Sequence, residues 1–407
     1  MNEQRQHDIH NPKGIITSFL ILNIISGTVG GAMQLVVPLY ALSLHATTVQ
    51  IGIIRGISGI GMLLLVIPAG FLVDHYGSKK LFITGSLAGT FSTFALTAAK
   101  VPLAMTALLG LSGLFSSLKM TALNASFFKN LKDMGLEKAG WFKGSMSIGL
   151  TFLGPVFGAF LVKVAEFPTI FSLLASMTLI PTALVLFFHN EDLHHTGMTE
   201  FSAVVRTQLH DFREMIGRRD IYLPLLTESV STACFSTFST FIVVIAVKTL
   251  HFKPGIASFL MTVEGGVFIF TVFAAGSLIN RLSQLQLYMS SVGVTVMSLI
   301  VLSMADTMAL ITGSTVILGL GLGLINLVTS SRIGRMEGEK GKIVGLFAAA
   351  VGAGISIGPM LGGVVGQYLG VRNVFLVFVP LFLLLGLLAA VLEGRCPAVV
   401  QETPVSG

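Results

Sequence analysis

The chain has 407 residues, of which 53% are hydrophobic and only 11% are charged, against about 25% charged in a typical soluble protein. This deficit of charge excludes an ordinary soluble fold, whose surface would need far more charged residues. The net charge of +6 comes from Lys and Arg in short segments between apolar runs, which favours membrane loops over a nucleic-acid surface. The two cysteines imply no disulfide framework, and the polar start of the chain argues against a cleavable signal peptide.

Apolar runs long enough to cross a bilayer follow one another along the whole chain, since a span needs about 20 mostly apolar residues. The abundant glycine in these runs is typical of membrane helices that pack closely. We therefore predict an all-α membrane protein with 12 transmembrane helices. They are expected near 15–42, 48–70, 81–99, 101–125, 140–162, 168–188, 221–247, 254–278, 285–304, 307–330, 342–368 and 372–392.

The distribution of basic residues predicts how the chain is oriented in the membrane. If the N-terminus is cytoplasmic, most Lys and Arg residues fall in cytoplasmic loops, as the positive-inside rule expects. A miscounted span would reverse every later loop and destroy this bias. We therefore expect both termini in the cytoplasm. The short loops and the lack of a targeting segment favour a bacterial inner (cytoplasmic) membrane.

One long polar connection, 189–220, divides the chain into two bundles of six predicted helices, 1–188 and 221–407. Its apolar residues recur at helical spacing beside several arginines, which predicts a basic amphipathic helix on the inner membrane surface. The apolar positions of this helix are Phe201, Val204, Val205, Leu209, Phe212 and Ile216. A regulatory binding segment is the alternative interpretation.

An internal repeat relates the two bundles. The loop after the second span carries Gly70 and Asp74, and the loop after the eighth carries Gly276 and Asn280 at the same spacing. Gly-Pro pairs in the fifth and eleventh spans recur at nearly the same offset. This pattern predicts two pseudo-symmetric halves, an arrangement that in known transporters places the substrate site between the halves near the midplane.

The segment 70–80, Gly-Phe-Leu-Val-Asp-His-Tyr-Gly-Ser-Lys-Lys, resembles motif A of the major facilitator superfamily (MFS), and the resemblance extends over essentially the whole chain. It implies the twelve-helix MFS fold and a conformational role for Gly70, Asp74, Gly77, Lys79 and Lys80. In the family the acid pairs across the cytoplasmic face and holds the outward-facing state, which would be the role of Asp74. From the residues alone, Gly70 permits close helix packing, Gly77 permits a turn with positive φ, and the two lysines anchor the topology.

Two departures from motif A are His75 and Ser78, where the family usually has a basic residue, and they weaken the inferred charge network. Motif B requires an arginine in the fourth span, which has none, so the resemblance does not support proton coupling by that route.

Glycine-proline patterns in the fifth and eleventh spans resemble motif C of the antiporters of this family. The matching positions are Gly154, Pro155, Gly158, Gly354, Gly358, Pro359, Gly362 and Gly363, while Ala159 replaces the last glycine of the first copy. The resemblance implies the drug or metabolite:proton antiporter branch and favours export. Ordinary packing glycines remain the alternative, since glycine allows close approach and proline bends a helix.

Charges inside the predicted spans are functional candidates, because each costs about 2.5–3.5 kcal/mol on insertion scales. Glu264, in the middle of the eighth span, is the first candidate for proton coupling or for binding a cationic substrate group. A structural hydrogen bond to a neighbouring helix is the alternative.

The other candidates lie at shallower or less costly positions. Glu228 and Lys119 lie at similar depth and could pair, although Lys119 could also extend to the inner surface. Arg55 could bind an anionic substrate group or reach the outer headgroups. Asn23 and Gln34 in the first span are further candidates for lining the cavity.

These features together predict a secondary transporter that works by alternating access, with proton-coupled efflux of a drug, siderophore or metabolite as the leading interpretation. A proton-coupled or facilitative importer is the main alternative, and a non-transporting membrane sensor has no supporting feature. The sequence shows no HExxH motif, no Cys/His cluster and no phosphate-binding loop, so we expect neither an enzyme nor a primary pump, and no metal site. Expected partners are a small-molecule substrate and the bilayer, not nucleic acid; the energy source is a proton gradient rather than a cofactor, and one chain is expected to work as a monomer.

Overall fold

The computed structural model describes residues 12–134, 138–188, 214, 218–276, 281–336 and 340–393. These ranges are mostly helical, and they contain no strand. The helices in chain order are α2 (Pro12–Ser43), α3 (Thr48–Tyr76), α4 (Ser78–Ala95), η1 (Leu96–Ala98), α5 (Pro102–Met134), α6 (Lys138–Ser147), η2 (Ile148–Leu153), α7 (Gly154–Val164), α8 (Phe167–Phe188), α10 (Arg219–Val244), η3 (Ile245–Thr249), α11 (Pro254–Ala274), α12 (Gln284–Met304), α13 (Met308–Arg335), α14 (Lys340–Tyr368), η5 (Val371–Phe375) and α15 (Phe378–Glu393).

These helices include 12 segments long and apolar enough to cross a membrane, which confirms the predicted number of spans. Several helices extend beyond the apolar runs; α3 continues to Tyr76 and α5 to Met134. The reason is that hydropathy marks only the hydrocarbon layer, whereas backbone hydrogen bonding continues through the polar residues that follow.

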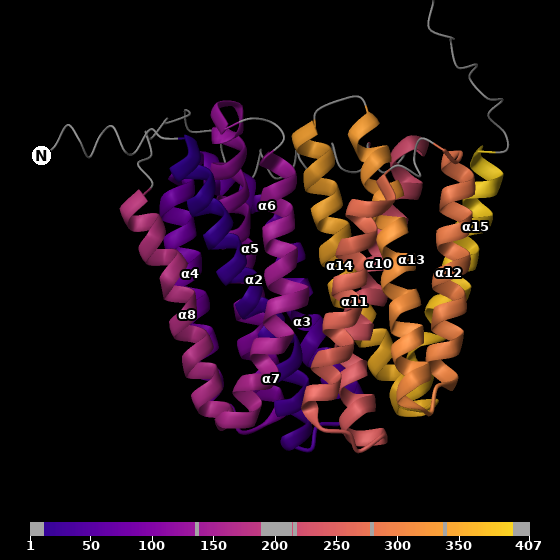
Figure 1. Ribbon diagram of the computed structural model, residues 1–407. Helices are drawn as coiled ribbons and strands as arrows, with labels where there is room; N and C mark the ends of the chain where they lie inside the picture. Colours follow the sequence, from indigo (N-terminus) through magenta and orange to yellow (C-terminus); the bar gives the residue numbers. More distant parts are fainter. Residues whose placement is uncertain are drawn as a thin grey trace, which may run out of the picture.

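The helices form two groups that stand side by side (Figure 1). We call α2 to α8 the N-half and α10 to α15 the C-half. The end of the bundle at which α2 begins, at the top of Figure 1, is the Pro12 end, and the other is the Ser43 end. The predicted amphipathic helix of 189–220 lies outside the described residues apart from 214 and 218–220, so it stays a prediction.

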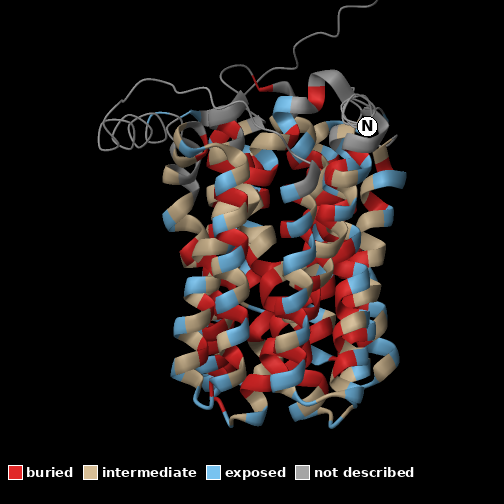
Figure 2. Cartoon of the chain, turned by 90° about the vertical axis from the view of Figure 1, so that its left-hand side faces the viewer, coloured by how far each residue is buried: buried red, intermediate tan, exposed pale blue. Residues whose placement is uncertain are grey.

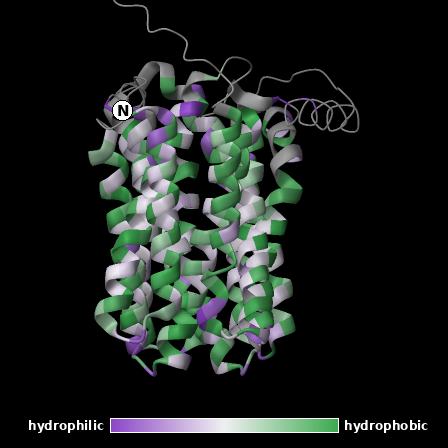
Figure 3. Cartoon of the chain, turned by 90° about the vertical axis from the view of Figure 1, so that its right-hand side faces the viewer, coloured by the Kyte–Doolittle hydropathy of each residue, from purple (hydrophilic) through white to green (hydrophobic). Residues whose placement is uncertain are grey.

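The outer surface of the bundle is apolar. Phe91, Leu103 and Phe270 each expose more than two thirds of their side chain, at 73%, 79% and 71%. Buried residues face the inside of the bundle (Figure 2), and hydrophilic residues gather mainly near its two ends (Figure 3). An apolar flank of this kind is stable only against lipid, because exposed apolar patches of such extent are unfavourable in water.

Glycines let the helices within the N-half touch backbone to backbone. A methyl group on Gly154 would lie 2.8 Å from the backbone nitrogen of Ala32, and one on Gly149 would lie 2.8 Å from that of Thr28. Since neither backbone can yield, only glycine fits at these two positions. The glycines of the fifth span thus hold η2 and α7 against α2.

The two halves also meet through glycines, along α3 and α14. A methyl group on Gly52 would overlap the carbonyl oxygen of Pro359 and lie 2.9 Å from Cα of Gly363. Nearer the middle of the helices, one on Gly59 would lie 2.6 Å from the backbone nitrogen of Ser356. These close approaches run from the Ser43 end to the middle of both helices.

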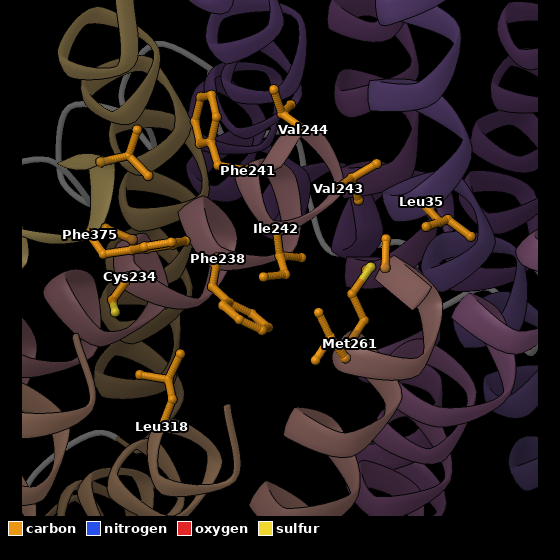
Figure 4. Packing of buried hydrophobic residues seen from close by; sticks show 14 of the residues in the cluster. Leu35, Cys234, Phe238, Phe241, Ile242, Val243, Val244, Met261, Leu318 and Phe375 are labelled. Carbon is orange, nitrogen blue, oxygen red and sulfur yellow. The ribbon is translucent and has the colours of Figure 1, made fainter. Parts of the chain in front are cut away.

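The largest hydrophobic core belongs to both halves. It includes Leu35 of α2 together with Val243 of α10 and Met261 of α11. Figure 4 shows Phe238 and Ile242 of α10 opposite Met261, which comes from the neighbouring helix of the C-half. The boundary between the halves is therefore a packed apolar contact, and the candidate site lies within it.

Candidate functional site between the two halves

A small pocket, with room for about one water molecule, lies at the boundary of the halves, and both halves contribute to its wall. The N-half supplies residues of α2, η2 and α7, and the C-half supplies residues of α10 and α11. The lining residues are Gln34, Thr151, Pro155, Phe235, Phe238, Ser239, Met261 and Glu264. This composition, mostly apolar with a few polar groups, is typical of small-molecule sites.

Among the described residues that line this pocket, Glu264 is the one acid. Its side chain is 1% exposed, and its Oε1 atom has no hydrogen-bond partner. A buried carboxylate without partners is strongly unfavourable in its charged form, so this group needs a proton or a cation to neutralise it. The structural hydrogen bond considered as the alternative from sequence is not present at Oε1.

Two glycines fix the backbone at Glu264. A methyl group on Gly265 would overlap Cβ of Thr151 in η2 and lie 2.6 Å from its Oγ1 atom. A methyl group on Gly319 of α13 would lie 2.6 Å from the carbonyl oxygen of Glu264. The acid is thereby held between the N-half on one side and α13 on the other.

A π-turn places Thr151 in the pocket. In η2 the backbone N–H of Gly154 bonds to the carbonyl of Gly149 rather than to the residue four positions before it. Pro155 follows, and its ring would clash with the carbonyl four positions earlier in a regular α-helix. The wider turn removes this conflict, and such turns inside helices are often found at functional sites. Thr151 donates a hydrogen bond from Oγ1 to the carbonyl of Ser147 at 3.0 Å.

Of the remaining candidates, Gln34 lines the pocket and is half-buried. Arg55 of α3 instead donates a hydrogen bond from Nε to Oγ1 of Thr240 on α10, at 3.4 Å, and so links the two halves. Asn23 is 1% exposed and donates from Nδ2 to the carbonyl of Phe142 at 2.8 Å, which places it between α2 and α6 inside the N-half rather than in this pocket.

Glu228 and Lys119 are both half-buried, and neither lines the pocket with Glu264. Among the described residues, no interaction joins Lys119 to Glu228, so their pairing stays a sequence prediction.

The described residues of motif A lie at the Pro12 end. Gly77 joins α3 to α4 with a φ of 84°, as expected for a turn that needs glycine. Lys79 donates from Nζ to the carbonyl of Leu186 near the end of α8, at 3.2 Å, and Lys80 is exposed. The side chain of Asp74 and the surroundings of Gly70 lie outside the described part of the chain, so the role inferred for Asp74 stays a prediction.

The motif C positions make helix contacts of two kinds. Within one half, Gly154 and Gly158 pack on α2, Gly354 and Gly358 pack on α10, and Gly362 meets Phe241 and Thr237 of α10. Across the boundary, Gly363 and the carbonyl of Pro359 meet α3. Only Pro155 of these residues lines the pocket.

The sequence does not mark Thr151, Phe235, Phe238, Ser239 or Met261 as pocket residues. Each is an ordinary member of an apolar run, and no linear motif marks it. Gly265 beside Glu264 is the one signal of this site in the sequence, because a glycine next to an embedded acid indicates that another helix packs closely against the backbone there. Among the described residues there is no group of His, Cys, Asp and Glu that could hold a metal ion.

Known proteins share the fold of this chain, and a sequence family covers most of its length. The fold is shared with the nucleoside transporter NupG, whose crystal structure superposes with a TM-score of 0.76 at 13% identity, over 94% of this chain and 99% of that one. The MFS-type transporter YfiS of Bacillus subtilis is 21% identical over 94% of this chain and 93% of its own length. The MFS-type transporter MJ1560 of Methanocaldococcus jannaschii is 20% identical over 85% of this chain and 89% of its own length.

The sequence model of the Major Facilitator Superfamily matches residues 19–336. The chain therefore belongs to the Major Facilitator Superfamily, a family of transporters that are in general not enzymes. It is a multi-pass membrane protein.

Proposed function

We propose that this protein is a proton-coupled secondary transporter that exports a small organic solute by alternating access. The observation that carries the proposal is the buried, unpartnered carboxyl oxygen of Glu264 in a pocket whose wall is shared by the two halves. A site built in this way changes when the halves move relative to each other. Neutralisation of the carboxylate by a proton is then linked to the same movement.

The motif C resemblance of the fifth and eleventh spans supports export as the direction of transport. Import is the second candidate, and Ala159, which replaces the last glycine of the first copy, is the observation that favours it. For location, we propose the cytoplasmic membrane of a bacterium, with the Pro12 end on the cytoplasmic side and the monomer as the working unit. The excess of Lys and Arg in the loops at that end supports this orientation.

The test is proton movement in liposomes. The purified protein is reconstituted with a pH-sensitive dye inside, a proton gradient is imposed, and organic cations, siderophores and metabolites are added in turn. We expect at least one compound to cause proton movement with the wild type, and we expect this movement to be lost with Glu264→Gln. The matched control is Glu166→Gln, the same change at an exposed acid in the loop between α7 and α8.

The control should move protons as the wild type does. Substrate flux that persists at the wild-type rate in Glu264→Gln would remove this residue from the mechanism. Movement of substrate in the same direction as the protons would favour the importer, because an exporter driven by proton entry moves its substrate in the opposite direction.

A further inference from the structure

The wall of the pocket restricts the charge of its ligand, and the restriction begins with Glu264. Oε1 of this residue has no hydrogen-bond partner, and no Lys or Arg is among the residues that line the pocket. Arg55, the cation on α3, is engaged with Thr240 instead. The positive charge that neutralises the carboxylate must therefore come from a proton or from the ligand itself.

The remainder of the wall restricts the body of the ligand. Phe235, Phe238 and Met261 present two aromatic rings and a polarisable thioether beside the acid. Aromatic faces attract organic cations, and methionine adapts to apolar ligands of varied shape. Gln34 and Ser239 supply a few hydrogen-bonding groups, which suffice for one polar substituent but not for the many hydroxyls of a sugar.

We infer that the substrate of this pocket is a compact organic cation with one positive charge, an amine on an apolar or aromatic body, which enters when the halves separate beyond the water-sized space present in this structure. This inference rests on the proposed transport function and names the substrate class of the same site. Carboxylates and phosphates are excluded because they would meet an acid with no cation beside it. Doubly charged cations are disfavoured because the wall offers a single carboxylate.

Charge balance at the acid is simple. Before the ligand enters, the Glu264 carboxyl group holds a proton. When the ammonium group binds, the carboxyl O–H bond breaks, the proton leaves to the solution, and the carboxylate forms an ion pair with the ligand. One proton is released for each cation bound, and no other reactant is needed.

The experiment measures equilibrium binding to the purified full-length protein in detergent, without a membrane gradient. Three probes of nearly equal size are compared by isothermal titration calorimetry at pH 7: 2-phenylethylammonium, the neutral 3-phenylpropanol and the anion 3-phenylpropionate. We expect the ammonium compound to bind at least about tenfold more tightly than the other two, a difference of about 1.4 kcal/mol. Titration in two buffers of different ionisation enthalpy should show release of a proton.

Variants test whether the preference comes from this site. Glu264→Gln should lose the preference for the cation, Glu264→Asp should retain part of it, and Glu166→Gln in the exposed loop should match the wild type. Gel filtration and circular dichroism establish that each variant is folded. Equal or tighter binding of the alcohol or the anion would overturn the inference, as would a cation preference that survives in Glu264→Gln or no binding of the cation at millimolar concentration.

This result is separable from that of the liposome assay. Selective cation binding without proton-linked flux would leave the substrate class standing and remove the proposed coupling. Proton-linked flux of an anion or a sugar would leave the transport function standing and remove the substrate class.

Discussion

At the scale of single residues, the neighbour of the embedded acid is as informative as the acid. Gly265 is the point at which α11 of the C-half touches the π-turn of the N-half, because a side chain there would overlap Thr151. The next residue, Gly266, has no atom within 4 Å of the position that its Cβ would occupy. Of these two adjacent glycines, only Gly265 makes a close contact between the halves.

We expect Gly265→Ala to destabilise the protein and to reduce transport, because the added methyl group forces α11 away from η2 beside Glu264. Overpacking of this kind typically costs about 1–3 kcal/mol. The measurement is the thermal unfolding temperature in detergent together with flux in liposomes.

The matched control is Gly266→Ala, which introduces the same methyl group into open space. It should unfold at or slightly above the wild-type temperature, since alanine favours the helix. Similar behaviour of the two variants would contradict the role given to the Gly265 contact.

The extent to which the sequence predicted the site differs from residue to residue. Glu264 was identified because a charge in an apolar run is costly wherever the helix faces. Asn23 was an equally polar candidate, yet its amide serves a backbone carbonyl inside the N-half, and nothing in its neighbours distinguishes that use from a cavity position. Phe235 and Phe238 could not be predicted at all, because which face of α10 meets α11 depends on contacts between distant parts of the chain.

At the scale of helices, the contact between α3 and α14 joins the halves toward the Ser43 end. Gly52 meets the carbonyl of Pro359 and Cα of Gly363, so backbone rather than side chains limits the approach. The twelve helices themselves were predictable, since their number and order follow from apolar runs. Their pairing was not, because glycine occurs in nearly every span and the sequence does not show which glycines face each other.

We expect Gly52→Ala to separate α3 from α14 and to favour opening of the bundle at the Ser43 end. A shift of about 1 kcal/mol changes the population of the open state roughly fivefold. The reporter is Ser239→Cys, a buried pocket position, in a chain whose native Cys234 and Cys396 are replaced by serine. Its reaction rate with a water-soluble thiol reagent should rise in the Gly52→Ala background.

Gly293→Ala on α12 is the control, because a methyl group there meets no atom within 4 Å. It should leave the reaction rate of Ser239→Cys unchanged. A rate that is also unchanged in the Gly52→Ala protein would mean that this contact does not limit access to the pocket.

At the scale of the whole molecule, two surface pockets lie at corresponding places in the two halves. A surface pocket at the Pro12 end of α4 and α5 is lined by Ser78, Lys79, Phe82, Ala122, Leu123, Ser126 and Val185. A second one, in the C-half between α12 and α13, is lined by Leu282, Gln284, Leu287, Val328 and Ser331. Phe82, Leu123 and Ser126 of the first pocket correspond to Leu287, Val328 and Ser331 of the second, each 205 positions later. The Gly-Pro pairs are 204 positions apart, so this correspondence supports the predicted duplication.

The orientation in the membrane is also a property of the whole molecule, and two exposed lysines test it. Lys80 lies at the Pro12 end and Lys253 at the Ser43 end, and both are exposed. With a membrane-impermeant maleimide, we expect Lys253→Cys to be labelled in intact cells and Lys80→Cys only after permeabilisation. Both variants are made in a chain whose two native cysteines, Cys234 and Cys396, are replaced by serine, so that only the introduced thiol is labelled. The reverse pattern would place the Pro12 end outside the cell.

The shared wall of the central pocket has a consequence for how its ligand can be found. A ligand bound in this pocket contacts both halves, so it stabilises their association in addition to filling the space between them. A true ligand should thus raise the unfolding temperature of the protein, by an amount that grows with its concentration relative to its dissociation constant. The increase in unfolding temperature in detergent can therefore be used to screen for ligands without a membrane or a gradient. It also detects compounds that the protein binds but releases too slowly to transport.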